Sequence, residues 1–298
     1  MAVSDFVGGK EEKELFDRGL ARIMLRTTSQ SMTKRTQLVF QHDAKLYKLQ
    51  TVVTALVPFS ALTGTQQSLF KVSSEGDHVV VTEGTIFHPQ GGGQPSDEGT
   101  MTAAADSAVF HVAAARKDDA GLVLHLGHFG VDGARFEVGQ AVEQTLDAEK
   151  RLLHSRFHTA GHVLGAAVRH LLEQEIDGFD ELKASHFPDS AACEFRGLID
   201  GRWKGPIQER LDDYVRRAMP VEIDWWDEDD FRANGLGRLI PERSQAAPGE
   251  KLRVVKIVGA EVYPCGGTHV DTTDLCGKTT VKKIARTKGT SRISYTVA

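Results

Sequence analysis

The chain has 298 residues, the usual length for two domains and enough to bury a substantial core. Apolar residues make up 40% and charged residues 26%, a composition typical of soluble globular proteins, which excludes a mainly disordered chain. No apolar stretch approaches the roughly 18 residues that cross a bilayer, so we expect no membrane partner. Three cysteines cannot build a disulfide framework and no secretory leader precedes them, so we expect a reducing, cytoplasmic location.

Residues 1–34 alternate blocks of charge without a sustained apolar period, which predicts a flexible leader. From residue 35 to residue 145, short strand-like segments are separated by Gly, Asp and Pro. We place these segments at 38–40, 46–57, 78–81, 109–113 and 122–126. Their spacing predicts a small antiparallel β-barrel domain.

The apolar period becomes helical between residues 146 and 175, which predicts a core-facing helix ending before Asp177 and Gly178. Strand-like and helical segments then alternate. We expect strands at 191–195, 221–226, 252–258, 278–284 and 292–297 and helices at 206–217 and 229–234. The sequence therefore predicts an α+β protein whose second domain, residues 146–298, is an α/β two-layer structure.

The net charge is −5, but the basic residues gather at the C-terminal end. After Gly277 there are six basic residues and no acidic one: Lys278, Lys282, Lys283, Arg286, Lys288 and Arg292. A local basic stripe on an otherwise acidic protein is typical of a surface that meets phosphates at one place. The alternative is a solvated edge strand protected by lysines, and charge alone does not choose between them.

Two histidines four residues apart, His158 and His162, fall within the predicted helix. This spacing puts both imidazoles on one face, one turn apart, where they can share an ion. Arg151, Ser155 and Arg169 fall on the same face, so we expect that face to be polar or accessible.

A second pair of metal-type ligands, Cys265 and His269, flanks two glycines. Gly266 and Gly267 allow a tight turn, so both side chains can point at one centre. Each pair alone is weak evidence, but together they form a Cys/His₃ set suited to Zn²⁺. His154, one turn before the helical pair, is a rival ligand and Cys276 a weaker one; we place both outside the set.

A glycine-rich segment, residues 85–99, contains three consecutive glycines followed by Gln94. Such a run can bind a phosphate or line a pocket, although it is more often an ordinary loop. Because no Lys-Ser/Thr follows, a nucleotide-binding P-loop is excluded.

Taken together, the three segments resemble the editing region of alanyl-tRNA synthetase and its free-standing relatives, the AlaX alanyl-tRNA editing proteins. The motifs are T-x-F-x-P-x-GGGQ-x-x-D-x-G, then HTAGH, then CGGTHV followed by KI and KG-x-x-RI, and the resemblance runs from about Thr36 to the C-terminus. Nothing in the chain resembles the aminoacylation region of the synthetase. The resemblance is therefore to the free-standing editing protein that carries an N-terminal β-barrel.

This resemblance implies hydrolysis, without ATP, of the ester between a wrong amino acid and the 3′ end of alanine tRNA. The wrong amino acid is chiefly serine and sometimes glycine, and the acceptor stem is the expected partner. It also implies that His158, His162, Cys265 and His269 bind zinc. Gly161 stands where the synthetase usually has Thr, and residues 183–189 also depart from its pattern, so the choice between serine and glycine stays open.

Thr159 and Gln94 are our candidates for contacting the substrate or the attacking water. A serine hydroxyl must find a polar partner that the methyl group of alanine cannot use. The alternative for Thr159 is a hydrogen bond to the backbone of its own helix. Whether zinc activates water or only positions the substrate stays open.

Two other functions compete with tRNA editing. A zinc peptidase also carries histidines four apart on a helix, but it needs Glu beside the first His, where this chain has Thr159. A non-catalytic tRNA-binding module with a structural zinc would be favoured by a closed site of four protein ligands.

Overall fold

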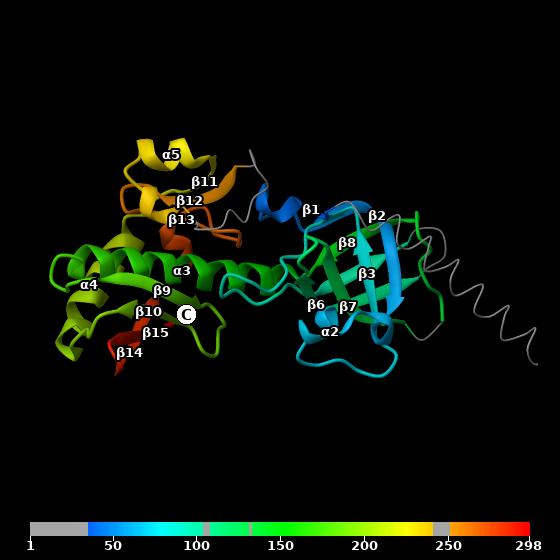
Figure 1. Cartoon of the computed structure of the whole chain (residues 1–298), viewed down its shortest axis with the longest axis horizontal. Helices are drawn as coiled ribbons and strands as arrows, with labels where there is room; N and C mark the ends of the chain where they lie inside the picture. Colours follow the sequence, from blue (N-terminus) through cyan, green and yellow to red (C-terminus); the bar gives the residue numbers. More distant parts are fainter. Residues whose placement is uncertain (1–34, 104–107, 131–132, 241–250) are drawn as a thin grey trace, which may run out of the picture.

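A computed structural model describes residues 35–103, 108–130, 133–240 and 251–298 (Figure 1). The predicted leader at 1–34 lies outside these residues. Within the described ranges, none of the helices combines the length and apolar character needed to cross a membrane.

The first part of the chain forms a closed six-stranded antiparallel barrel, which confirms the prediction. Around the barrel the strands run in the order β2-β3-β7-β6-β5-β8. Their bounds are β2 Lys48–Pro58, β3 His78–Thr82, β5 Gly99–Thr102, β6 Val109–Lys117, β7 Val123–Phe129 and β8 Ala141–Leu146. The sequence missed β5 and β8, because β5 is short and begins at a glycine, and β8 alternates with polar residues such as Gln144.

Short elements join the barrel strands. Strand β1, Gln37–Leu38, pairs in parallel with β4, Gly84–Thr85, and the other short elements are η1 Val39–Gln41, η2 Phe59–Ala61 and α2 Gly64–Ser68. The strand expected at 38–40 is therefore wrong over most of its length, since a 3-10 turn buries Phe40.

Helix α3, Ala148–Leu172, follows β8 directly and is capped by the side chain of Asp147, which accepts from the backbone N–H of Lys150. The helix agrees with the predicted one. Of the two possibilities expected for the His158 face, polar or accessible, the structure shows a polar face that is buried: Arg151 and His158 are each 1% exposed. The glycine-rich loop and the Cys265 turn cover this face, which the helical period alone does not reveal.

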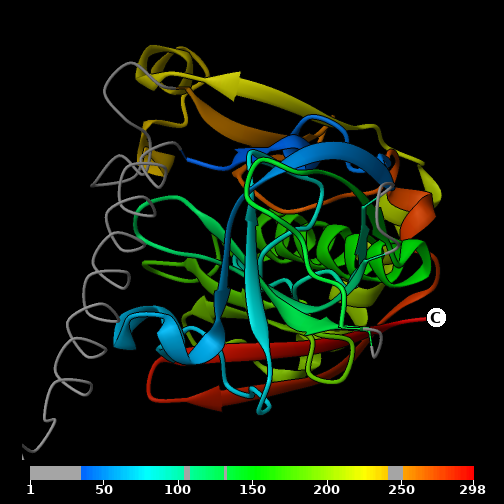
Figure 2. The same cartoon turned by 90° about the vertical axis from the view of Figure 1, so that its right-hand side faces the viewer.

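Two antiparallel sheets accompany α3 (Figures 1 and 2). The larger has the order β14-β15-β10-β9, and α3 and α4 pack on it around a shared apolar core. The smaller has the order β11-β12-β13 and lies on the other side of α3. The bounds are β9 Asp180–Ser185, β10 Ala192–Arg196, β14 Thr279–Thr287, β15 Thr290–Val297, β11 Val221–Trp226, β12 Leu252–Ile257 and β13 Glu261–Pro264, with α4 Lys204–Arg216, α5 Glu228–Ala233, η3 Gly201–Trp203, η4 Gly237–Leu239 and η5 Thr273–Cys276.

A buried ion pair ties the barrel to α3. The guanidinium of Arg151 pairs with Asp97 at the end of the glycine-rich segment, and both side chains are 1% exposed. Arg151 also donates to the carbonyls of Ala44 and Ile86. Removing one partner of such a pair costs about 3–5 kcal/mol, because the other charge is left buried and unpaired. The pair therefore holds the glycine-rich segment in a fixed position beside the helix.

Candidate metal centre

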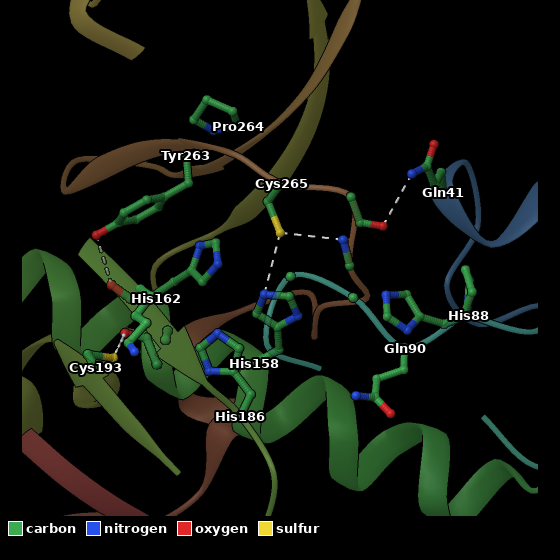
Figure 3. Close-up of a pocket in the computed structure, with 18 of the residues that line it drawn as sticks. Gln41, His88, Gln90, His158, His162, His186, Cys193, Tyr263, Pro264 and Cys265 are labelled. Atoms are coloured by element: carbon green, nitrogen blue, oxygen red, sulfur yellow. Dashed lines mark hydrogen bonds between the residues drawn. The ribbon is translucent and has the colours of Figure 1, made fainter. Parts of the chain in front are cut away.

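The two predicted ligand pairs converge, although they are about 100 residues apart in sequence. Figure 3 shows three of the four side chains, His158, His162 and Cys265. The ligand atoms of His158, His162, Cys265 and His269 lie within 4.8 Å of one another. The Sγ atom of Cys265 is 3.4 Å from Nε2 of His158 and 3.3 Å from Nε2 of His269. This arrangement can hold a metal ion.

The turn that carries Cys265 follows β13 and must come very close to α3. A Cβ atom on Gly267 would lie 2.2 Å from Cε1 of His158, so only glycine fits there. The backbone N–H of Gly267 donates to Sγ of Cys265 at 3.4 Å. Gly267 therefore allows the turn to pack closely against His158 of α3, in addition to allowing the chain to turn tightly.

Gln94 orients His158 from behind. Its amide nitrogen donates to Oγ1 of Thr268, and its Oε1 accepts from the backbone N–H of Thr268. Oε1 is therefore the acceptor in the 2.7 Å contact with Nδ1 of His158, and that ring nitrogen is the donor. The lone pair on Nε2 is left facing the cluster, as metal-binding histidines require.

Thr159 takes the same position behind His269. Its Oγ1 lies 3.1 Å from Nδ1 of His269 and accepts from the backbone N–H of Val270 at 3.2 Å. Both Thr159 and Gln94 are fully buried, and neither lines the cavity described below. The structure thus places them against the ligands, and their expected contact with the substrate does not follow from this geometry.

The rival ligands lie elsewhere. His154 is buried, but it is outside the cluster and its Nδ1 has no hydrogen-bond partner. Cys276 lies in the apolar core, where burial raises its pKa to about 12.

Burial shapes the protonation of the cluster. It lowers the pKa of His158, His162 and His269 well below the ordinary value, and the neighbouring histidines lower it further. Neutral imidazoles with free lone pairs are the form that binds metal. Nδ1 of His162 is enclosed without a hydrogen-bond partner, which is an unsatisfied buried nitrogen in the donor set. The residues therefore fit a bound metal ion.

A cavity of about 600 Å³ opens beside the cluster. His158, His162 and Cys265 contribute to its wall, and Gly91 and Gly92 face them from the glycine-rich loop. Of the two roles expected for that loop, lining a pocket is confirmed. Gly93 has a φ of +78°, and a Cβ atom there would lie 2.4 Å from the carbonyl oxygen of Ala184, so this glycine lets the loop pack on the end of β9.

Two cavity residues were missed from the sequence. His186 stacks on His158, and Tyr263 contacts the ring of His162 at 4.4 Å between centroids. Burial lowers the pKa of His186 to about 4. A sequence feature that could have indicated His186 is Gly161, because glycine is unfavourable in the middle of a helix. A Cβ atom there would lie 2.3 Å from the His186 ring.

The predicted basic residues lie on or beside the β14–β15 hairpin, whose first strand is an outer strand of its sheet (Figure 2). Lys282 and Lys283 are both exposed, because the β-bulge between Val281 and Lys283 interrupts the alternation of faces. Arg286 lies 3.4 Å from Asp200, and Arg292 lies 3.1 Å from Glu194. Their contact with nucleic acid stays a prediction.

Two family models match the chain, one over each part of the fold. Residues 11–150 match the family described as tRNA synthetases class II (A). Residues 252–294, which include the Cys265 turn, match the threonyl and alanyl tRNA synthetase second additional domain. Barrel and metal turn are thus similar to parts of tRNA synthetases.

Comparison with individual proteins shows which tRNA synthetases and related proteins the chain is similar to. The chain is 32% identical over 225 residues to an alanine–tRNA ligase of Methanobrevibacter smithii, covering 75% of this chain and 24% of that protein. It is 30% identical over 234 residues to the alanyl-tRNA editing protein AlaX-L of Pyrococcus horikoshii, covering 76% of this chain and 53% of that protein. The chain thus spans about a quarter of the length of the ligase and half that of the editing protein. The resemblance to alanyl-tRNA editing proteins, noted from the three motifs, is confirmed.

Proposed function

We propose that this protein is a zinc-dependent deacylase that edits mischarged alanine tRNA. Its chief substrate is serine-charged alanine tRNA, with the glycine-charged form as a second substrate. The main observation in support is that the chain, which is similar to an alanyl-tRNA editing protein, has a cluster of candidate metal ligands beside a cavity. These ligands are His158, His162, Cys265 and His269. A thiolate and three imidazoles favour zinc over harder ions.

The reaction consumes one water, which attacks the ester carbonyl carbon. The bond from that carbon to the ribose oxygen breaks. One proton of the water passes to this ribose oxygen, which leaves as a hydroxyl of the tRNA, while the rest of the water becomes part of the carboxyl group of the released amino acid. Zinc, when bound, supplies a Lewis acid beside the ester. The chain itself supplies fixed geometry, because Gln94 and Thr159 hold the rings of His158 and His269 through their Nδ1 atoms.

The competing function is a tRNA-binding module whose zinc is only structural. A structural zinc is enclosed by its ligands. Here three of the four candidate ligands border the cavity, which leaves room for a substrate next to the cluster. This observation favours the deacylase.

The proposed partner is the acceptor stem and 3′ end of alanine tRNA. The exposed basic residues of the β14–β15 hairpin supply positive charge for its phosphates.

We also propose that the barrel, residues 35–145, and the remainder, residues 146–298, are separate domains. Separate apolar cores within the two parts support this division.

A deacylation assay tests the proposal. The protein is mixed with serine-charged, glycine-charged and alanine-charged alanine tRNA, with and without a metal chelator. We expect release of serine, slower release of glycine and sparing of alanine, with release abolished by the chelator and restored by zinc. Tight tRNA binding without hydrolysis of any ester would instead support the binding module.

A further inference from the structure

His186 follows β9 and lies beside the metal cluster without belonging to it (Figure 3). Its ring stacks on that of His158, with 4.2 Å between centroids and 24° between planes. The residue is 2% exposed and lines the cavity. Its ring is therefore held in one orientation at the cavity wall.

Hydrogen bonds assign the proton of this imidazole. The hydroxyl of Tyr295 donates its single proton to the carbonyl of Phe157 at 2.8 Å. Its oxygen can then only accept in the 2.8 Å contact with Nδ1 of His186, so Nδ1 carries the hydrogen. The lone pair of the neutral ring is left on Nε2.

Nε2 of His186 is open to the cavity. In the parts of the chain that the structure covers, the enclosed side-chain atoms without a hydrogen-bond partner belong to His154, His162 and Arg253. Nε2 of His186 has no protein partner there either, yet it is not enclosed. The space next to the ring is the cavity that it lines.

Gly161 on α3 makes room for this arrangement. A Cβ atom at position 161 would lie 2.3 Å from Cε1 of His186 and 2.7 Å from the hydroxyl of Tyr295. Any side chain there would displace the ring. The glycine and the histidine are therefore linked, since the imidazole occupies the volume that a side chain at 161 would take.

We propose that His186 is a specificity-determining residue whose Nε2 accepts a hydrogen bond from the side-chain hydroxyl of a seryl ester. This inference rests on the proposed deacylation. The polar groups of Thr159 and Gln94 are already engaged by the ligands and by Thr268 and Val270, away from the cavity. The methyl group of alanine has no proton to donate, so it gains nothing from His186.

The test replaces His186 with Phe, which keeps a ring against His158 and removes the acceptor. We expect kcat/KM for serine-charged alanine tRNA to fall roughly tenfold, the worth of one neutral hydrogen bond. The value for glycine-charged tRNA should not change, because glycine has no hydroxyl. Zinc content by elemental analysis should stay at the wild-type level.

Binding supplies a second measurement that does not depend on turnover. The probes are adenosine carrying serine or alanine through a 3′-amide, which cannot be hydrolysed as an ester. The wild type should bind the seryl probe more tightly, and His186→Phe should bind the two equally. The matched control is His170→Phe on α3, which also removes a histidine–tyrosine hydrogen bond, to Tyr214 at 2.5 Å, but lies outside the cavity.

Two further variants keep the proposal open to refutation. His186→Gln places an acceptor near the position of Nε2 and should restore part of the seryl preference. If His186→Phe does not fold, Gly161→Ala should displace the ring and give the same selective loss. An equal loss on serine-charged and glycine-charged tRNA, or an unchanged probe preference in folded His186→Phe, would overturn the inference. If the wild type hydrolyses neither ester, the deacylase proposal fails, and probe binding then decides the role of His186 separately.

Discussion

Next to the candidate ligands His158 and His269, the side chains of Gln94 and Thr159 are enclosed and engaged in specific hydrogen bonds, whereas the lysines of the β14–β15 hairpin point into solvent. A buried group that loses its partner costs about 1–3 kcal/mol, while an exposed ion pair contributes about 0–1 kcal/mol. A single substitution at the metal centre should therefore have a large effect by itself, because it disturbs a fixed geometry. Substitutions on the hairpin should act through the total charge they remove, and their effect should depend on the salt concentration.

The largest effect should come from removing a ligand at the enclosed site. Cys265→Ala deletes the thiolate, and we expect zinc content to fall well below one equivalent per chain. Elemental analysis of the dialysed protein measures it. His154→Ala, one turn before His158 on the same helix, is the control and should keep its metal; full zinc occupancy in Cys265→Ala would refute the assignment.

The next effect tests whether the support behind a ligand matters. Gln94→Leu removes the acceptor that fixes Nδ1 of His158, and loss of such a supporting contact costs roughly 10–100-fold in metal affinity. Competition with a chromogenic chelator measures the affinity. Gln90→Leu on the same loop, whose side chain lines the cavity, should leave it unchanged. Equal affinities in the two variants would mean that the cluster does not need its enclosed partner.

A third experiment extends the contrast between buried and exposed groups to the barrel. Burial lowers the pKa of His125 to about 4, below the unfolded value of 6.5, so the unfolded chain takes up a proton first as the pH falls. The stabilisation is complete above pH 6.5 and is lost progressively toward pH 4. Between pH 7 and pH 5 this histidine should account for about 2 kcal/mol of lost stability.

His125→Gln should therefore show a correspondingly smaller decrease in the free energy of unfolding between these pH values, measured by urea denaturation. The exposed His128 on the same strand provides the control, His128→Gln, which should keep the wild-type pH dependence. Identical pH dependence in both variants would show that burial of His125 is not the cause.

The smallest effect should come from the hairpin. Lys282→Ala/Lys283→Ala should weaken tRNA binding at low salt and flatten the log–log salt dependence by roughly 2, since about 0.9 counterion is released per phosphate contact. Because the bulge exposes both side chains, we expect the effect of two contacts rather than one. Zinc content should not change.

The control for the hairpin removes the same charge from the barrel, as Lys48→Ala/Lys71→Ala, and should leave the slope as it is. Unchanged affinity and slope in the folded hairpin variant would instead support edge protection. The tRNA path would then be sought near Arg156 and other basic residues of α3.

The sequence by itself determined the elements whose information is local. The helical period placed α3, and the spacing of His158 and His162 put two donors on one face because a helix repeats every 3.6 residues. The Cys265 turn was equally readable, since glycines between two donors permit a tight return. Strands β11 and β12 were also found, because short apolar or aromatic runs mark them directly.

Only the tertiary structure decided what surrounds those elements. The helix face with the histidines was expected to be polar or accessible; it is polar, and a loop from the barrel and the Cys265 turn cover it. Thr159 and Gln94 were chosen for their polar groups, and folding turned those groups toward ligand nitrogens. His186 carried no motif of its own; its place against Gly161 follows from β9 packing beside α3, a contact between segments that no local pattern encodes.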